Sequence, residues 1–347
     1  MTMRTTFGPI TVIEQVWQDG TRQVRPLQSH GLTHLGYTLS LQRAVTDFGI
    51  EESFEHARQR LKEHYHIDVP LSAVRTLTED HARRAPASTL PAVKRTGEAA
   101  VIVTSMDGTM IPTVRMAEGP EKDARKRRTS EWREAKLCFA QDTSLASASY
   151  EVTFGDAASA GNRWRAVVEQ AGLGAGTHVH AVCDGAPWIE AQFRTQFGRQ
   201  QRQFLVDFFH ISERLALVKE ETGRTVAWLH RQQGHLLAGK PRKMLAAVRA
   251  LVEPPGLPRE EAPVREACGY LEHQVPFMDY VAAKARSLPI GSGQIEGSHR
   301  SILHKRLKIS GAWWTHATAE SMAYLRVLRA NNQWESFWRN TFKAAIT

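Results

Sequence analysis

Cysteine is scarce in this chain, and long apolar runs are absent. The 347 residues include three cysteines, Cys138, Cys183 and Cys268, which are isolated along the sequence and odd in number. This spacing excludes a disulfide framework and a zinc-binding cysteine pair. No stretch approaches the roughly 18 apolar residues of a membrane-spanning helix, and the first ten residues lack the basic and apolar regions of a signal peptide. We therefore expect a cytoplasmic globular protein that has no membrane partner.

Acidic residues are outnumbered by basic ones. Lys and Arg total 45 against 36 Asp and Glu, so the formal net charge is +9. Such a surplus suits a polyanionic partner, although a plain excess of surface charge is an equally common explanation. The basic residues are also clustered, because residues 122–128 read KDARKRR and a second cluster covers residues 299–308. At 42% hydrophobic residues, the chain is long enough for one large domain and a smaller one.

The N-terminal part of the chain indicates helices after a segment of uncertain structure, residues 1–39. Residues 40–85 show helical spacing in three runs, the last of which begins after Ser72, a residue typical of a helix cap. Arg75, Arg83 and Arg84 lie outside the apolar face of that last helix. Short helices joined by a tight turn fit a helix-turn-helix that reads DNA, and they equally fit a helical cap on the next domain.

A linker and a change of pattern follow. Residues 86–97 are rich in Pro, Ala, Ser and Thr, and after them the pattern becomes strand-like. We expect a core at residues 98–212 with strands at 99–106, 134–142, 148–154, 177–183 and 203–208, a short return at 110–114, and helices at 162–171 and 187–197. Three strands followed by helix, strand, helix and strand is the order of an RNase H-like core.

The remaining chain is predicted to be helical. Residues 213–288 lack any strand signal and look like an insertion, while residues 289–347 begin with a rigid turn that releases into a helix. Ser292 is the expected cap of that helix, and Glu296 lies in its first turn. The predicted fold class is thus α/β: an RNase H-like mixed sheet flanked by helices, with a helical insertion and a small N-terminal helix-turn-helix-like domain.

Two aspartates share one context. Asp107 and Asp184 each follow an apolar strand-like run, and each precedes a glycine. Asp-Gly is also a common turn signal, so either residue taken alone is more simply explained as structural. In the proposed strand order, however, the first and fourth strands are neighbours, which brings the two carboxylates together. Like charges in proximity are costly unless a cation lies between them.

Magnesium is the cation that suits such a site. It prefers hard oxygen ligands, and two ions in a phosphoryl-transfer site need about three carboxylates. Glu296 is the candidate third ligand, since the helix dipole helps to keep a first-turn glutamate ionised. The simpler explanation, a solvated glutamate near a helix start, stays open on this reasoning alone. We therefore expect two divalent ions, Mg²⁺ or Mn²⁺, at Asp107, Asp184 and Glu296.

The motifs around these acids carry a family resemblance. Residues 105–109 (SMDGT), 132–136 (WREAK), 183–189 (CDGAPWI) and 289–297 (PIGSGQIEG) resemble bacterial insertion-sequence transposases of the ISKra group, as do RLK at 306–308, SG at 310–311, WW at 313–314 and residues 332–338. The resemblance implies a DDE transposase with an RNase H-like domain related to Mutator-like transposases. It places the three metal carboxylates at Asp107, Asp184 and Glu296.

The resemblance extends to a further pair and meets one departure. Asp207 and His210, in the sequence DFFH, are similar to the C/DxxH element of such insertion-bearing transposases, where a catalytic-proximal role and a structural one are equally plausible. Members of the group often carry a cysteine-rich zinc-binding stretch near the N-terminus, whereas residues 1–40 here contain no cysteine. By comparison with the group, we therefore expect a truncated or divergent end-recognition region.

Candidate DNA contacts follow from charge and aromatic content. Residues 122–128 are expected to form a mobile basic loop that neutralises phosphates, and the cluster after Glu296 places positive charge beside a scissile phosphate. Trp188, Trp313 and Trp314 are candidates for stacking on unpaired bases, although core packing is the better explanation for at least two of them. The predicted DNA-binding residues are Arg75, Arg83, Arg84, Lys122, Arg125, Lys126, Arg127, Arg128, Arg300, Lys305, Arg306, Lys308 and Trp188.

Three functions remain open at this point. The first is a transposase that cuts double-stranded DNA at terminal inverted repeats and joins the 3′ ends to target DNA, acting as a dimer or higher oligomer that holds two ends together. The second is an RNase H-like nuclease without strand transfer. The third is a DNA-binding regulator derived from a transposase, for which a lost acid would argue, and no acid is lost.

Overall fold

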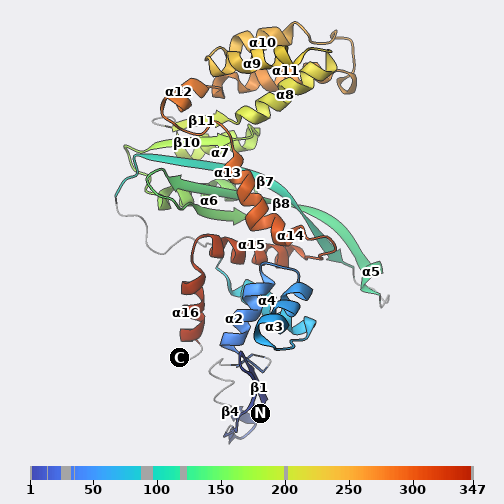
Figure 1. The fold of residues 1–347 in the computed structure, drawn as a ribbon, viewed down its shortest axis with the longest axis vertical. Coiled ribbons are helices and arrows are strands. Elements are labelled where there is room, and N and C mark those ends of the chain that lie inside the picture. The colour runs from blue at the N-terminus through green and yellow to red at the C-terminus, as the bar shows by residue number, and fades with distance from the viewer. Residues whose placement is uncertain are drawn as a thin grey trace.

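The computed structural model describes residues 2–13, 15–24, 33–34, 36–86, 97–117, 123–198 and 202–344. Lys122 and almost all of the predicted linker lie outside these residues. The molecule is elongated, with small N-terminal strands at one end, a sheet in the middle and a group of helices at the other end (Figure 1). A hairpin arm projects sideways from the sheet (Figure 1).

The central sheet has five strands in the order β11-β10-β7-β8-β9. The strands are β7 (Val101–Met116), β8 (Arg128–Asp142), β9 (Ser149–Thr153), β10 (His178–Cys183) and β11 (Arg202–Val206). β10 is parallel to both β7 and β11, whereas β8 is antiparallel to β7 and β9. This mixed sheet flanked by helices is compatible with an RNase H-like fold, and the predicted adjacency of the first and fourth strands is confirmed.

Helices cover both faces of the sheet because the strands alternate their apolar side chains. Ile102 and Met106 of β7 pack with α6 (Ala157–Gln170) and α7 (Pro187–Phe197) around the buried Trp164. Val103 and Ile111 point to the opposite face, which is covered by α13 (Gly293–Ser298) and α15 (His316–Ala330). The two faces therefore have separate apolar cores.

The prediction that the first strand ends at Asp107 is wrong. β7 continues through Asp107 and Gly108 to Met116 and pairs with β8 over its whole outer length, from Ile102 opposite Asp142 to Met116 opposite Arg128. An Asp-Gly pair turns the chain only where no partner strand continues beside it, and here the ladder with β8 satisfies the backbone on both sides. The expected separate return strand at 110–114 is the outer part of β7.

The structure corrects a second prediction at the tip of the hairpin formed by β7 and β8. We call the projecting outer part of this hairpin the arm. α5 (Ala124–Arg127) forms a helical turn at the tip, and Arg128 is the first residue of β8. The basic cluster at residues 122–128 is therefore not simply a loop in the residues that are described. The arm carries this cluster away from the body of the protein (Figure 1).

The segment after β11 is helical. It contains α8 (Phe208–Glu221), α9 (Val226–Leu237), α10 (Pro241–Arg249), η1 (Arg259–Glu261), α11 (Pro263–Gln274), η2 (Val275–Phe277) and α12 (Tyr280–Ala285). These helices lie together beyond the β11 edge of the sheet (Figure 1). We refer to them as the insertion, while the predicted division of the chain into domains stays a prediction.

The N-terminal helices are α2 (Leu39–Gly49), α3 (Phe54–Tyr65) and α4 (Leu71–Arg84), which share a core around Leu41, Leu61 and Leu77. Ser72 does not cap α4, because the helix begins at Leu71 and Pro70 occupies the cap position. α4 also packs against α15. Before α2 lie β1 (Thr2–Thr5), β2 (Gly8–Thr11), β3 (Trp17–Asp19), β4 (Arg22–Val24), β5 (Thr33–His34) and β6 (Tyr37–Thr38).

The C-terminal part completes the fold. α13 continues into the π-helix η3 (His299–His304) and α14 (Lys305–Leu307), and α15 is followed by α16 (Trp334–Ala344). In this widened turn the carbonyl of Ser301 accepts a hydrogen bond from Nη2 of the buried Arg326 at 2.6 Å. None of the described helices has the length and apolar character that crossing a membrane requires.

Arg306 is not a DNA contact as predicted. Its side chain is 2% exposed, and its guanidinium lies between the rings of Phe54 and Trp314, 4.4 and 4.7 Å from their centroids. Its Nε donates to the carbonyl of Gly49 at 2.8 Å. Burial lowers the pKa of Arg306 to about 9. Arg306 therefore joins the N-terminal helices to the C-terminal part and cannot reach a phosphate.

We predict that Arg306→Lys lowers the free energy of unfolding by about 2 kcal/mol, because an ammonium cannot fill the planar space between two rings. Chemical denaturation measures this loss. The matched control is Arg300→Lys, six residues earlier, where the side chain is 77% exposed and the expected change is within about 0.5 kcal/mol. Equal stability of both variants would show that the stacked guanidinium contributes nothing.

Candidate active site

Asp107 in β7 and Asp184, the residue directly after β10, lie at the same level of two adjacent parallel strands. The paired register of β7 and β10 ends with Thr104 opposite Ala181, and each aspartate is three residues further along the chain. Both side chains also point to the same face, since Met106 and Cys183 beside them pack in the opposite core. Burial, reinforced by the nearby Asp107 carboxylate, raises the pKa of Asp184. The predicted proximity of the two acids thus follows from the sheet.

The carboxylate of Asp207 holds the next element in place. It is 1% exposed at the start of α8, where Oδ1 accepts hydrogen bonds from the backbone N–H groups of Phe209 and His210. Oδ2 accepts from both the backbone N–H and the hydroxyl of Ser292. Burial alone would raise the pKa of Asp207, but the hydrogen bonds from His210 and Ser292 lower it to about 2. Both of its oxygens are therefore already used in positioning backbone.

Ser292 connects Asp207 to the predicted glutamate. It occupies the cap position of α13 as predicted, but its hydroxyl makes no cap bond and donates to Asp207 instead, with Glu296 Oε1 3.4 Å away. The preceding turn is fixed as well, because Phe208 N donates to the carbonyl of Ile290 at 2.9 Å. Glu296 is thereby held at the end of the sheet where β10 terminates.

These contacts form a small acidic and histidine cluster. Ligand atoms of Asp207, His210 and Glu296 lie within 4.8 Å of one another. His210 Nδ1 is 3.6 Å from Asp207 Oδ2, an ion-pair distance, and the Asp207 carboxylate raises the pKa of His210 to about 9. Asp184 interacts electrostatically with His210 as well as with Asp107. The structure thus brings Asp207, His210 and Glu296 into one cluster, with Asp184 close enough to interact with both His210 and Asp107.

Sequence reasoning missed two groups at this site. His299 Nε2 lies 3.3 Å from Asp107 Oδ2, and the spacing of three residues from Glu296 on a helix was the available signal. Tyr270 of the insertion donates its hydroxyl hydrogen to the carbonyl of Asp184 at 2.7 Å. No local sequence feature marks Tyr270, because only the tertiary fold brings α11 to the end of β10.

The donor set fits a hard divalent cation. Asp107, Asp184 and Glu296 each keep a partly exposed carboxylate, whereas both oxygens of Asp207 are taken by hydrogen bonds. Burial raises the pKa of Asp184 and the nearby Asp107 carboxylate adds to the increase, and a cation between the two acids would favour their charged forms. Oxygen ligands from carboxylates are those that Mg²⁺ and Mn²⁺ prefer.

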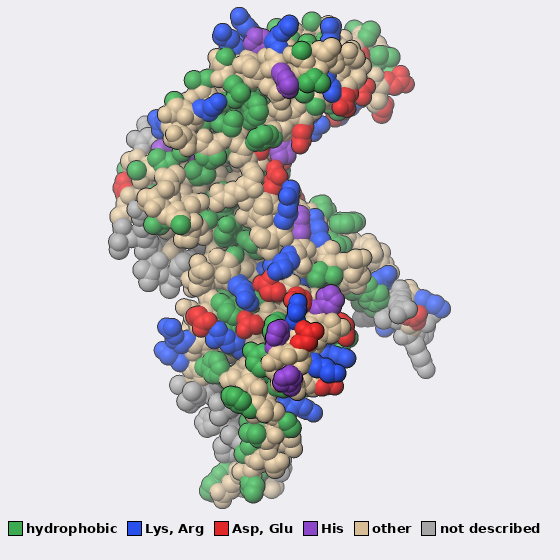
Figure 2. All heavy atoms as spheres, in the orientation of Figure 1, with side chains coloured by type: hydrophobic (Ala, Val, Ile, Leu, Met, Phe, Trp, Pro, Cys, Tyr) green, Lys and Arg blue, Asp and Glu red, His purple; other side chains and the backbone are tan. Residues whose placement is uncertain are grey.

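The surface around the site is hollowed. Figure 2 shows a concave face between the insertion and the arm, with acidic, basic and histidine side chains gathered along its inner edge. Arg300 is exposed one turn after Glu296, and Lys308 Nζ donates to Thr109 Oγ1 at 3.0 Å. Lys305 is paired with Glu51 at 2.7 Å. Positive side chains therefore border the acids on the helix that carries Glu296.

The other predicted DNA-binding residues lie in two places. Lys126, Arg127 and Arg128 are at the tip of the arm with the backbone of Arg125, and the Arg128 guanidinium lies 3.9 Å from the ring centroid of the exposed Trp313. On α4, Arg84 is exposed while Arg75 and Arg83 form ion pairs with Glu79 and Asp80.

The predicted tryptophans differ in environment. Trp188 is half-buried, with Lys136 Nζ 5.6 Å from its ring centroid. Trp314 is 2% exposed and packs in the core, whereas Trp313 is 37% exposed. Trp313 is therefore the better placed of the pair to meet a ligand.

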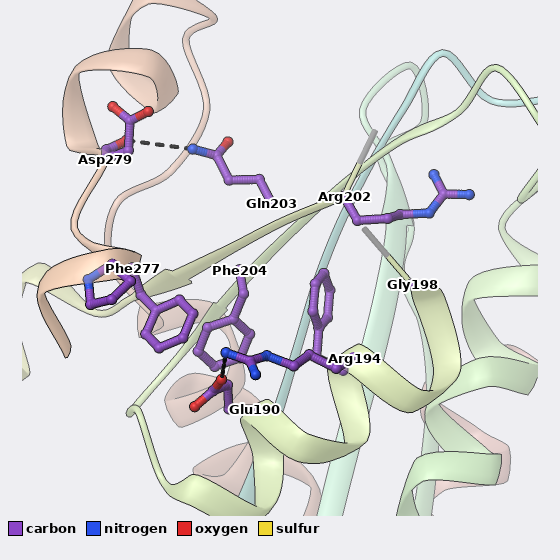
Figure 3. A pocket seen from close by; sticks show the side chains of 10 residues that line it. Glu190, Arg194, Gly198, Arg202, Gln203, Phe204, Phe277 and Asp279 are labelled. Carbon is purple, nitrogen blue, oxygen red and sulfur yellow. Dashed lines mark hydrogen bonds and ion pairs between the residues drawn. The ribbon is translucent and has the colours of Figure 1, made fainter. Parts of the chain in front are cut away.

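A separate cavity of about 340 Å³ lies between α7, β11 and η2. Figure 3 shows Arg194 directed toward Glu190, with which it forms an ion pair, while Phe204 meets Phe277 edge to face at 5.3 Å. None of the predicted site residues lines this cavity. It follows the seam where the insertion packs on the edge of the sheet.

Comparisons with known proteins give little support for any one family. No family model and no curated protein sequence matches this chain. Among solved structures, the chain is similar to the Drosophila P element transposase strand transfer complex, with 9% identity and a TM-score of 0.32 over 92% of this chain and 86% of that chain. A similarity of this size does not establish a shared fold.

The Asp207–His210 pair predicts a pH-dependent stability. The lowered pKa of Asp207 means that its stabilisation is complete above its ordinary pKa of about 3.9 and is lost as the pH falls toward 2. The raised pKa of His210 means that its share is complete below about pH 6.5 and is lost as the pH rises through 9. The melting temperature of Asp207→Asn should therefore fall furthest below wild type between about pH 4 and 6.5.

Melting curves in the presence of a chelator, recorded from about pH 2 to 10, measure this difference in melting temperature. Asp156→Asn is the matched control, because Asp156 caps α6 through Ser159 N with a lowered pKa and no histidine contributes to the shift. The difference in melting temperature between wild type and Asp156→Asn should become smaller only at acid pH. If the difference in melting temperature between wild type and Asp207→Asn stayed constant as the pH rose through 9, the role given to His210 would be contradicted.

Proposed function

We propose that this chain is a DDE transposase that hydrolyses DNA phosphodiesters at the ends of a mobile element and joins the resulting 3′ ends to target DNA. The observation that carries the proposal is that Asp107 in β7 and Asp184 directly after β10 lie at one level and on one face of the sheet. Glu296 is held at the same end of the sheet through Asp207 and Ser292. The motif resemblance to ISKra-group transposases supports the same three residues.

The chemistry divides between metal ions and the chain. Two divalent ions held by Asp107, Asp184 and Glu296 would activate the attacking water or 3′-hydroxyl and stabilise the leaving 3′-oxygen. Arg300, exposed beside Glu296, attracts the DNA backbone toward the acids. Asp207 acts as a positioning residue, since its oxygens hold α8 and the start of α13.

DNA would lie in the hollow between the insertion and the arm. The basic tip of the arm, with Arg128 stacked on Trp313, supplies phosphate contacts at a distance from the acids. The exposed arginines of α4 supply a second region of contact. Because strand transfer acts on two element ends, we infer a dimer or higher oligomer in the DNA complex.

The central test replaces each acid separately. Asp107→Asn, Asp184→Asn and Glu296→Gln are each expected to lower the rate of nicking at least about 100-fold on labelled DNA from the element's ends with Mg²⁺ or Mn²⁺, because each removes preorganised charge from the transition state. Glu260→Gln, in η1 of the insertion, is the control and should cleave normally. Full cleavage by the three acid variants would sink the proposal.

The products of the same reaction separate the alternatives. Joining of the cleaved 3′ ends to a plasmid target supports a transposase. Cleavage without joining would identify an RNase H-like nuclease. Sequence-specific DNA binding without cleavage, and unchanged by the three substitutions, would identify a regulator.

The arm predicts a salt-dependent contact. Replacing Lys126 and Arg127 together by alanine should reduce the slope of log affinity against log salt by roughly 1 to 2, since each phosphate contact contributes about 0.9. Binding of a mixed-sequence duplex at several salt concentrations measures the slope. Arg165→Gln on α6, over the opposite face of the sheet from the acids, should leave it unchanged. An unaltered slope in the arm variant would exclude the tip as a phosphate contact.

A further inference from the structure

His299 is a buried histidine whose side chain lies close to the carboxylate of Asp107. The residue is 3% exposed, and neither ring nitrogen makes a hydrogen bond of good geometry within the described part of the chain. A buried polar group without a partner costs free energy. Nε2 nevertheless lies 3.3 Å from Asp107 Oδ2, so the ring is aimed at a proposed metal ligand.

The surroundings of His299 fix its ring. It lies one helical turn after Glu296, and its ring stacks on that of His304, with centroids 5.8 Å apart and planes at 26°. His304 is held in turn, because its Nε2 lies 2.8 Å from Thr109 Oγ1 on β7. Burial, with the nearby Lys308, lowers the pKa of His304 to about 4, so that ring is neutral at physiological pH. The π-helical turn that joins the two histidines therefore lies along β7 at Asp107 and Thr109.

Without this ring, the Asp107 carboxylate would keep a hydrogen bond on Oδ1 and have no side-chain partner on Oδ2 among the described residues. Its Oδ1 accepts from the backbone N–H of Gly108 at 2.7 Å, and Oδ2 faces His299. Unlike Asp184, which begins a loop, Asp107 sits inside a continuous strand, so its backbone is fixed and only the side-chain torsions remain. A donor on Oδ2 leaves further lone pairs on both oxygens for a cation.

We infer that His299 is a positioning residue that donates its Nε2–H to Asp107 Oδ2 and fixes the orientation in which Asp107 binds a divalent ion. This inference rests on the proposed metal-dependent function and extends it to the group that orients one ligand. Partners of this kind typically change metal affinity or activity by about 10- to 100-fold when removed. His299 also links the positions of two proposed metal ligands, because it contacts Asp107 and follows Glu296 on the same continuous helix.

The test compares two substitutions with different hydrogen-bonding capacity. His299→Phe keeps a ring of similar shape without a donor, and His299→Gln returns an N–H donor near the position of Nε2. Mn²⁺ binding to the DNA-free protein, measured by electron paramagnetic resonance, should weaken about 10- to 100-fold in His299→Phe. His299→Gln should recover most of that loss, and melting temperatures identify any variant that loses the fold.

His304→Phe is the matched control, because it alters the stacked neighbour that contacts a hydroxyl instead of a carboxylate. It should bind Mn²⁺ nearly as the wild type does. Wild-type affinity in His299→Phe would overturn the inference, as would an equal loss in His299→Gln and His299→Phe. Failure of the wild type to bind Mn²⁺ would instead overturn the proposed function beneath it.

A second measurement does not depend on the folding of His299 variants. In the wild type, histidine nitrogen resonances should show His299 protonated on Nε2, and Asp107→Asn should shift that resonance while leaving the His304 resonances in place. A proton on Nδ1 only would overturn the inference.

Discussion

The buried carboxylate of Asp207 is the interaction on which the arrangement of the site depends. One of its oxygens accepts hydrogen bonds from two backbone N–H groups in the first turn of α8, directly after β11. The other oxygen accepts a hydrogen bond from Ser292 N at the start of α13. Between Asp207 and Ser292, which are 85 residues apart in sequence, the chain runs through the whole insertion. The charge-assisted hydrogen bonds of the buried aspartate hold the two ends of this helical segment together. Glu296 can therefore lie beside acids that are distant in sequence.

The strands and the two aspartates were accessible to sequence reasoning because they depend on local pattern. Apolar β-branched runs predict β7 and β10, and parallel neighbours put Asp107 and Asp184 at one level. The end of β7 was mispredicted because Asp-Gly carries a turn preference that a long cross-strand ladder outweighs. Arg306 was misassigned for a similar reason: its position in a basic cluster says nothing about the two aromatic rings that enclose it.

His299 and Tyr270 illustrate what local pattern leaves out. The spacing of Glu296 and His299 places both on one helix face, but whether that face meets an acid depends on how α13 crosses the sheet. That crossing is set by the Asp207 and Ser292 contact and by the carbonyl of Pro289, which lies 2.8 Å from His180 Nε2. Neither contact has a sequence signature, since each joins groups more than eighty residues apart.

Charge at this end of the sheet is balanced unevenly. Asp207 is matched by His210 and by three backbone N–H groups, so it is stable as an anion in the protein alone. Asp184 has one hydrogen bond from Ala186 N, and burial with Asp107 nearby acts against its charged form. The buried Asp207 and the partly buried Asp184 thus have opposite pKa shifts, which separates an acid that organises the backbone from one that is left to meet a cation. The same distinction explains why the cluster of closest ligand atoms, which includes Asp207, differs from the set of acids that we assign to metal binding.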